Sequence, residues 1–250
     1  MFDSLVILLA ATIFLASIVR TATGFGFALI AIPILSFFLE PVSAVAITML
    51  FQTASAIPIA FSNLTKKEWD YAMKLLLFSL TGLLPGVAFL IITPPIAVQL
   101  IVTLCIFCAL FLIAKGVSFN ATLSVKQWVT VGFISGFMHG LAGVSGPPIL
   151  AVLHADTTLE KRQKRQIMSV FFLFAGTLAL IPMLTQVPRL LLNSKTLTVL
   201  CIAMFSGMYI GQKLFNRLNA TQFRFCTLVL MLISGLLATG QLIQFIIHLL

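Results

Sequence analysis

Two basic residues stand beside glycine-rich stretches inside otherwise apolar sequence, and both stretches could bind an anion. Arg20 ends one long apolar run and is followed by Thr21-Ala22-Thr23-Gly24-Phe25-Gly26. His139 ends another and is followed by Gly140-Leu141-Ala142-Gly143-Val144-Ser145-Gly146-Pro147-Pro148. Glycine lets a backbone turn and approach a ligand closely, and free peptide N–H groups at the start of a helix attract negative charge. These residue types favour the binding of a small anion over covalent chemistry.

The predicted substrate contacts lie in these two stretches. Arg20 would pair with the anion, and hydroxyl and amide groups would hold it without a second buried charge. His139, which ordinarily titrates near neutral pH, could carry a coupling proton. Simpler roles also fit: an arginine at the cytoplasmic end of a helix, a histidine hydrogen-bonded in the core, and glycines that allow close helix packing. The residues predicted to bind substrate are Arg20, Thr21, Thr23, Gly24, Gly26, His139, Gly140, Gly143, Ser145 and Gly146; no metal or cofactor ligand is predicted.

The composition identifies an integral membrane protein. Of the 250 residues, 60% are hydrophobic and only 8% are charged, and the mean hydropathy is +1.16. A water-soluble domain could not carry so much apolar surface. The net charge of +9 does not indicate nucleic-acid binding, because the Lys and Arg residues lie in short loops between apolar runs. The expected partners are therefore a small anionic solute and the lipid bilayer, with no nucleic acid.

Glycine, proline and charged residues divide the chain into ten apolar segments. The first two are short for a crossing of about 20 residues, so they are expected to form a re-entrant hairpin or two halves of a broken helix. A charged connector is expected at Asn63–Asp70. The segments are Leu5–Val19, Phe27–Leu39, Pro41–Ser62, Tyr71–Ile92, Ile96–Ala114, Trp128–His139, Pro147–Ala155, a segment after Arg165 that ends at Leu184, Leu197–Phe215, and a last one after Arg224.

The order of these features occurs twice. A shift of 120 residues superposes Gly26 on Gly146, Glu40 on Glu160 and Phe51 on Phe171, and a shift of 125 superposes Gly82 and Gly86 on Gly207 and Gly211. Each half has five segments, and an odd number makes the halves inverted relative to each other. We therefore expect an all-α polytopic bundle of 8–10 transmembrane or re-entrant segments. Residues 1–118 would form the first inverted repeat and residues 119–250 the second.

Charge predicts the orientation in the membrane. If the segments cross alternately from an external N-terminus, 13 of the 15 Lys and Arg residues lie on the cytoplasmic side, and only Arg189 and Lys195 lie outside. This count predicts a multi-pass protein of a cell membrane, of the bacterial inner-membrane type, with both termini extracytoplasmic. The basic run Lys161–Arg165 is then a topology signal, although a substrate funnel or a contact with anionic lipid also fits it.

The two glycine stretches resemble the repeated motif of the sulfite exporter TauE/SafE family of membrane transporters. The second copy, from Gly132 to Pro147, is similar to that motif, and so is the stretch from Thr23 to Pro33, less completely. The closing segment resembles the family at Gly207-Met208-Tyr209-Ile210-Gly211, Arg217-Leu218-Asn219 and Phe223-Arg224. The resemblance implies secondary transport of small sulfur-containing or organic anions, such as sulfite or sulfonates, coupled to an ion gradient. In the first copy, Arg20 stands where the second has Gly140, and Thr23 where it has Gly143.

Other function classes remain as alternatives. Cys105 and Cys108 have the spacing of a redox or metal pair, although small apolar packing explains cysteines inside a span. His154 and Asp156 could act with His139 in a membrane-embedded enzyme, or they could be a polar cluster at the end of a helix. A passive anion channel is a third alternative. The small number of acidic residues, six in all, favours a transporter over an enzyme.

Overall fold

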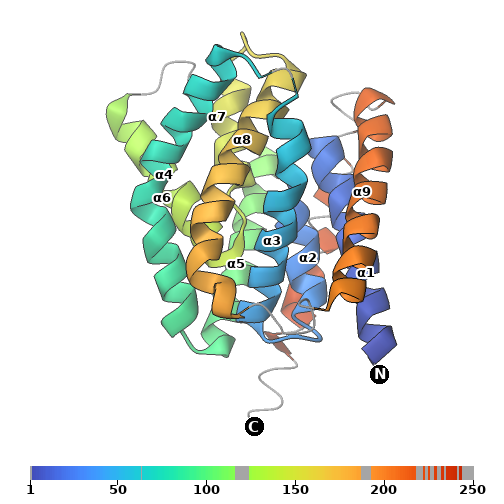
Figure 1. Ribbon diagram of the computed structural model, residues 1–250. Coiled ribbons are helices and arrows are strands. Elements are labelled where there is room, and N and C mark those ends of the chain that lie inside the picture. Colours follow the sequence, from blue (N-terminus) through green and yellow to red (C-terminus); the bar gives the residue numbers. More distant parts are fainter. Residues whose placement is uncertain are drawn as a thin grey trace.

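The computed structural model describes residues 2–62, 64–115, 124–186 and 193–217, together with shorter stretches between 222 and 243. In these parts of the chain the regular structure is helical. The elements are α1 Phe2–Thr23, α2 Phe27–Leu35, α3 Pro41–Ala60, α4 Lys66–Ile92, α5 Pro95–Lys115, α6 Val125–Ala142, α7 Gly146–Ala155, α8 Lys161–Leu180, the 3₁₀ turn η1 Ile181–Gln186, and α9 Ser194–Arg217 (Figure 1).

Long apolar helices confirm the polytopic helical membrane protein. Five of them are long and apolar enough to cross a bilayer, namely Ser4–Thr23, Pro41–Ala60, Lys66–Ile92, Lys161–Thr185 and Ser194–Arg217. By contrast, α2 has 9 residues and α7 has 10, and at 1.5 Å per residue each rises about 15 Å, half of a bilayer core. Two short helices thus lie among full-length ones.

The prediction of a short first segment was wrong. α1 has 22 residues and continues through Arg20 and Thr21 to Thr23, and α6 continues through Gly140 to Ala142. Arginine is a good helix former, and one threonine or glycine is tolerated at a helix end. The interruptions are therefore narrower than the glycine-rich stretches, and they cover residues 24–26 and 143–145.

Helix starts follow local signals. A capping box between Thr65 and Glu68 begins α4, so most of the expected Asn63–Asp70 connector is the first turn of that helix, and Asn63 lies outside the described residues. Another capping box, between Glu160 and Gln163, begins α8. In each box, side chains satisfy backbone N–H groups that have no partner within the helix. The predicted repeat boundary at 118/119 and half of the last predicted segment lie outside the described residues.

The long helices pack as a central pair flanked by two outer pairs. α3 contacts α8 in the middle, while α1 packs along α9 on one side and α4 along α6 on the other (Figure 1). Gly82 and Gly86 allow the close approach of α4 to α6, since a side-chain carbon there would collide with the carbonyls of Phe133 and Phe137. A different pair, Gly207 and Gly211, brings α9 equally close to α1, at the carbonyls of Phe14 and Ile18. Both predicted glycine pairs therefore serve helix packing.

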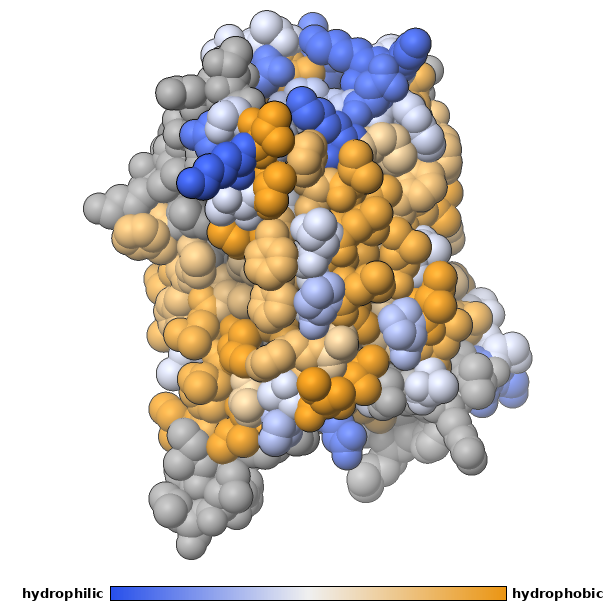
Figure 2. All heavy atoms as spheres, turned by 90° about the vertical axis from the view of Figure 1, so that its left-hand side faces the viewer, coloured by the Kyte–Doolittle hydropathy of each residue, from blue (hydrophilic) through white to orange (hydrophobic). Residues whose placement is uncertain are grey.

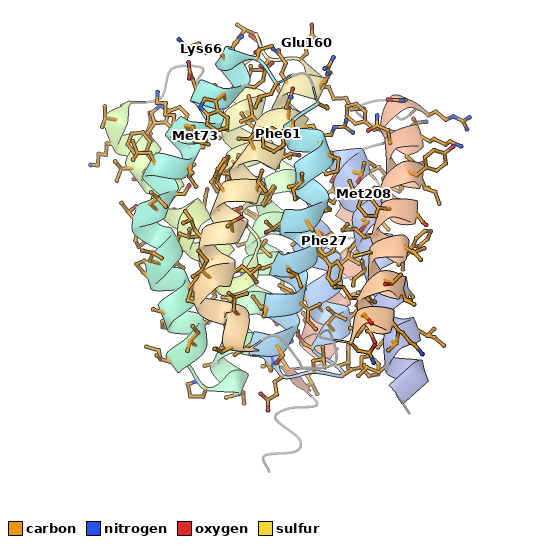
Figure 3. All side chains as sticks on the ribbon, in the orientation of Figure 1. Phe27, Phe61, Lys66, Met73, Glu160 and Met208 are labelled. Carbon is orange, nitrogen blue, oxygen red and sulfur yellow. The ribbon has the colours of Figure 1, made fainter. Side chains whose placement is uncertain are left out.

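Polar and apolar surfaces are separated along the bundle. Figure 2 shows hydrophilic side chains gathered at one end of the visible face and hydrophobic side chains over most of the rest. Figure 3 places Lys66 and Glu160, at the starts of α4 and α8, at that same end. The N-terminal end of α1 lies at the opposite end (Figure 1). The broad apolar girdle is what a lipid environment requires.

Candidate functional site

The first break separates α1 from α2. Gly24 and Gly26 have φ of +86° and +92°, a left-handed conformation that residues with side chains adopt at a cost. The N–H of Gly24 donates to the carbonyl of Arg20 at 2.6 Å. The Thr23 hydroxyl donates to the carbonyl of Phe25 and accepts from its N–H, the latter at 3.1 Å. Much of the polar backbone of this break is thus already hydrogen-bonded.

The second break separates α6 from α7. Gly143 has φ +63° and donates to the carbonyl of His139 at 2.7 Å, while Val144 donates to that of Met138 at 3.3 Å. This left-handed glycine closes the helix. Pro147 and Pro148 lack N–H groups, so Gly146 supplies the backbone donor that the first turn of α7 has left. Fewer backbone N–H groups are therefore free to bind an anion than the glycine content suggests. Side chains are the better candidates for anion contacts.

The two breaks touch each other. A side-chain carbon at Gly146 would lie 2.8 Å from the Cβ of Phe25, and one at Gly143 would lie 3.3 Å from the Cβ of Ala28. Segments about 120 residues apart in the sequence therefore meet inside the bundle. Both predicted discontinuities are confirmed, and they lie side by side.

The central helices α3 and α8 each hold one break. Gln52 of α3 is 2% exposed and donates from Nε2 to the carbonyl of Gly143 at 3.2 Å. Arg165 of α8 is 8% exposed and donates from Nη1 to the carbonyl of Thr21 at 2.9 Å. Each bond satisfies a carbonyl near the end of a helix, where the helix itself offers no donor. The long central helices thus fix the positions of both breaks.

Arg20 is completely buried, with 0% of its surface exposed. Within the described residues, its Nε, Nη1 and Nη2 atoms have no hydrogen-bond partner, and no carboxylate pairs with it. The guanidinium carbon lies 4.7 Å from the centre of the Phe172 ring, a cation–π contact that offsets part of the cost of burial. A buried cation without a counter-ion is expensive. Three donor atoms are therefore left for an anionic partner.

His139 lies against the same phenylalanine. Its ring centre is 5.5 Å from that of Phe172 and 5.8 Å from that of Phe171. Nδ1 is 3.0 Å from the Ser145 hydroxyl, whereas Nε2 is buried and unpartnered within the described part of the chain. The fold thus brings Arg20 and His139 against one aromatic ring, with the Ser145 hydroxyl of the second break beside His139.

This cluster lies near the middle of the central helices α3 and α8. Phe172 is the twelfth of the 20 residues of α8, and Gln52 is the twelfth of the 20 residues of α3. Both helices are candidate spans. Although Arg20 is in the last turn of α1, helical side chains tilt toward the N-terminus of their helix, and this tilt directs its guanidinium toward the middle of the span.

The remaining predicted site residues have other neighbours. Thr21 faces α9, where its Cβ would lie 2.8 Å from a side-chain carbon at Gly211. Gly140 belongs to α6 and approaches the carbonyl of Leu83 in α4. The hydroxyl of Thr23 is bonded within its own turn. These residues shape the breaks, while Arg20, His139 and Ser145 are the polar side chains that the fold brings together.

Asp156 ends the short helix α7 and lies outside the cluster. It accepts from the N–H of Thr158 at 3.0 Å and from its hydroxyl at 2.6 Å. The Thr158 hydroxyl bond holds the pKa of the Asp156 carboxyl below its usual range. The side chain of His154 lies outside the described residues. Within those residues, no three His, Cys, Asp or Glu side chains are grouped as metal ligands.

Sequence reasoning missed three neighbours of the site: Phe172, Gln52 and Arg165. A signal existed for the first two, because the shift that superposes Phe51 on Phe171 also superposes Gln52 on Phe172. Arg165 was hidden in the basic run that was interpreted as a topology signal. Its position on the buried face of α8, one turn before buried Ser169, distinguishes it from exposed Lys161 and Arg162.

Comparison with known proteins agrees with this architecture. The profile of the family described as sulfite exporter TauE/SafE matches residues 9–238, which include both breaks. Searches of curated proteins and of solved structures gave no match. Since the profile covers most of the chain, the protein belongs to the sulfite exporter TauE/SafE family and is a multi-pass membrane protein of the transporter type.

Proposed function

We propose that this protein is a secondary transporter of small sulfur-containing or organic anions, such as sulfite or a sulfonate, and that the anion binds between the two helix breaks. The observation that carries the proposal is Arg20, a fully buried cation with three unpartnered nitrogens among the described residues. Keeping such a charge at membrane depth is costly unless a ligand or partner compensates it. An oxyanion of suitable size would accept hydrogen bonds from the guanidinium fork.

The second half completes the proposed site. His139 and Ser145 come from the two sides of the second break, and they hydrogen-bond each other at 3.0 Å. They would contact the anion on the side away from Arg20, with Phe172 as the shared wall. The amides of Gly24 and Gly143 already donate to carbonyls. We therefore assign the main anion contacts to Arg20, His139 and Ser145, and to the first-turn amides of α2 and of Gly146.

Alternating access between two inverted repeats is the proposed mechanism. It is supported by the matching of partners: α1 pairs with α9 as α6 pairs with α4, and each pair meets at two glycines four residues apart. Two half-length helices meeting at the centre of a bundle are typical of transporters that rock around a fixed site. We further propose that the N-terminus is extracytoplasmic and that the end bearing Lys66 and Glu160 faces the cytoplasm.

Flux measurements test the function. The purified protein is reconstituted in liposomes, and uptake of sulfite, methanesulfonate and acetate is followed against empty liposomes. Saturable uptake of at least one anion, with trans-stimulation by the same anion inside, is the expected result. Saturation and trans-stimulation separate a carrier from a passive channel. Correctly folded protein that moves none of these anions would contradict the proposal.

A further inference from the structure

The two ring nitrogens of His139 have different surroundings. Nδ1 is committed to the Ser145 hydroxyl, and Nε2 is buried without a partner in the described part of the chain. A neutral imidazole has one donor and one acceptor nitrogen, and taking up a proton makes both of them donors. A protonated Nε2 is stabilised here only if a hydrogen-bond acceptor faces it. The described protein groups provide none.

The described groups that face His139 come from three helices. α1 contributes the cation Arg20, the start of α7 contributes the hydroxyl of Ser145, and α8 contributes the rings of Phe171 and Phe172. Among the described residues, Arg20 is the charged side chain whose field reaches the imidazole. Within the described part of the chain, this site therefore has one fixed positive charge and no negatively charged side chain.

A bound anion changes this balance. It neutralises the field of Arg20 and offers an acceptor to Nε2, so that an imidazolium would be paired on both sides, by Ser145 and by the anion. Anion binding then favours proton binding, and by thermodynamic reciprocity the proton favours the anion. Because Arg20 and His139 are both completely buried, the two ligands would be carried together in an occluded site.

We infer that the protein carries each anion together with one proton, held on Nε2 of His139. The inference rests on the proposed anion site and adds the co-transported ion. The step is a proton transfer without redox change: the proton is taken up with the anion on one side and is released with it on the other. For a monovalent anion the cargo then has no net charge. An inward proton gradient would drive accumulation of the anion.

Methanesulfonate is the suitable probe, because it is the anion of a strong acid and cannot itself bring in the proton. Proteoliposomes contain the pH dye pyranine, and internal acidification is compared with methanesulfonate uptake. The expected result for the unaltered protein is about one proton per anion. Uptake should also be insensitive to a potassium diffusion potential imposed with valinomycin. Uptake of methanesulfonate without acidification would overturn the inference and leave the anion transporter standing, whereas no uptake of any anion would count against the proposed function itself.

His139→Gln tests the residue. We expect methanesulfonate uptake to weaken, because one anion contact is lost. The uptake that remains should carry about tenfold fewer protons per anion and should respond to the imposed potential, because a bare anion now crosses. Ser135→Ala is the matched control and should keep the full ratio. Its buried hydroxyl lies one turn earlier on α6 and has no hydrogen-bond partner among the described residues. Unchanged acidification in His139→Gln would overturn the assignment.

A measurement on the unaltered protein does not depend on the folding of a variant. Binding of methanesulfonate in detergent is followed by calorimetry in two buffers with different ionisation enthalpies, and the difference gives the number of protons taken up. About one proton per bound anion supports the inference. Binding heat that is independent of the buffer, which means no proton uptake, would contradict it.

Discussion

The two breaks have one backbone design and different chemistry. Each is a three-residue interruption that begins with a left-handed glycine, Gly24 in the first break and Gly143 in the second. A side chain from a central helix holds each break in place. The first break has Arg20 and is held by Arg165, whereas the second has His139 and is held by the neutral Gln52. Two similar backbone breaks thus carry different side chains, a permanent cation at the first and an ionisable imidazole at the second.

The comparison predicts its largest effect at the permanent cation. Arg20→Gln should lower anion uptake at subsaturating concentration by about 100-fold, because losing one partner of a buried charged contact costs about 2–5 kcal/mol. Lys161→Gln removes the same charge at an exposed position and should change uptake by less than about threefold. Initial rates of anion uptake into proteoliposomes measure both effects. Equal losses in the two variants would mean that a general field, and not a site, attracts the anion.

The two glycines should differ in tolerance. Alanine at either position costs about 1–2 kcal/mol for the left-handed backbone. At Gly24 the new carbon would also lie 3.0 Å from Cγ and 3.3 Å from Cα of Arg165, while at Gly143 its nearest neighbour is the Cβ of Ala28 at 3.3 Å. Thermal unfolding in detergent should therefore show Gly24→Ala as the less stable variant.

A third glycine provides the control for that experiment. A side-chain carbon at Gly240 would meet none of the described residues within 4 Å, so Gly240→Ala should not lower the unfolding temperature. If Gly143→Ala were as stable as this control, the strained turn at the second break would be refuted.

Removing the Gln52 hydrogen bond should have a smaller effect, on the stability of the fold. Gln52→Leu leaves the buried carbonyl of Gly143 without its donor, and this should cost about 1–2 kcal/mol. Gln212→Leu is the comparison, because its partner is the exposed Asn216 side chain, and it should cost less than about 0.5 kcal/mol. Thermal unfolding measures both. Equal stability of the two variants would show that the Gln52 bond does not hold the break.

The cysteines of α5 should have the smallest effect. Cys108 is exposed on the bundle surface and Cys105 is partly buried, and neither belongs to the cluster around Phe172. Changing both to Ser should leave anion uptake within about twofold, because buried or lipid-facing cysteines act as small apolar groups. Loss of uptake in the double variant would instead favour the thiol-redox alternative.

Sequence reasoning located the breaks because glycine and proline act locally. Gly24 and Gly143 stop their helices through backbone conformation alone, and a capping box such as Glu160 with Gln163 is likewise visible in the sequence. Exact ends were less predictable. Arg20 was expected at the interruption, yet it lies inside α1, because an arginine does not stop a helix and its position is decided by what the next residues permit.

Tertiary neighbours could not be obtained in the same way. That Phe25 touches Gly146, or that Arg165 reaches the carbonyl of Thr21, depends on how helices distant in sequence cross. A basic run looks the same in sequence whether all of it faces solvent or one member turns inward. Periodicity along α8 separates these cases only for Arg165, which continues the buried stripe of Ser169 and Phe172.

A structure with a bound anion tests the central claim most directly. Crystals or vitrified samples would be prepared with selenite, whose selenium can be located by its anomalous or scattering signal. The account predicts density within about 3–4 Å of the Arg20 guanidinium and of Nε2 of His139, and its loss in Arg20→Gln. Selenium found only at the basic end that bears Lys66, with nothing between the two breaks, would contradict it.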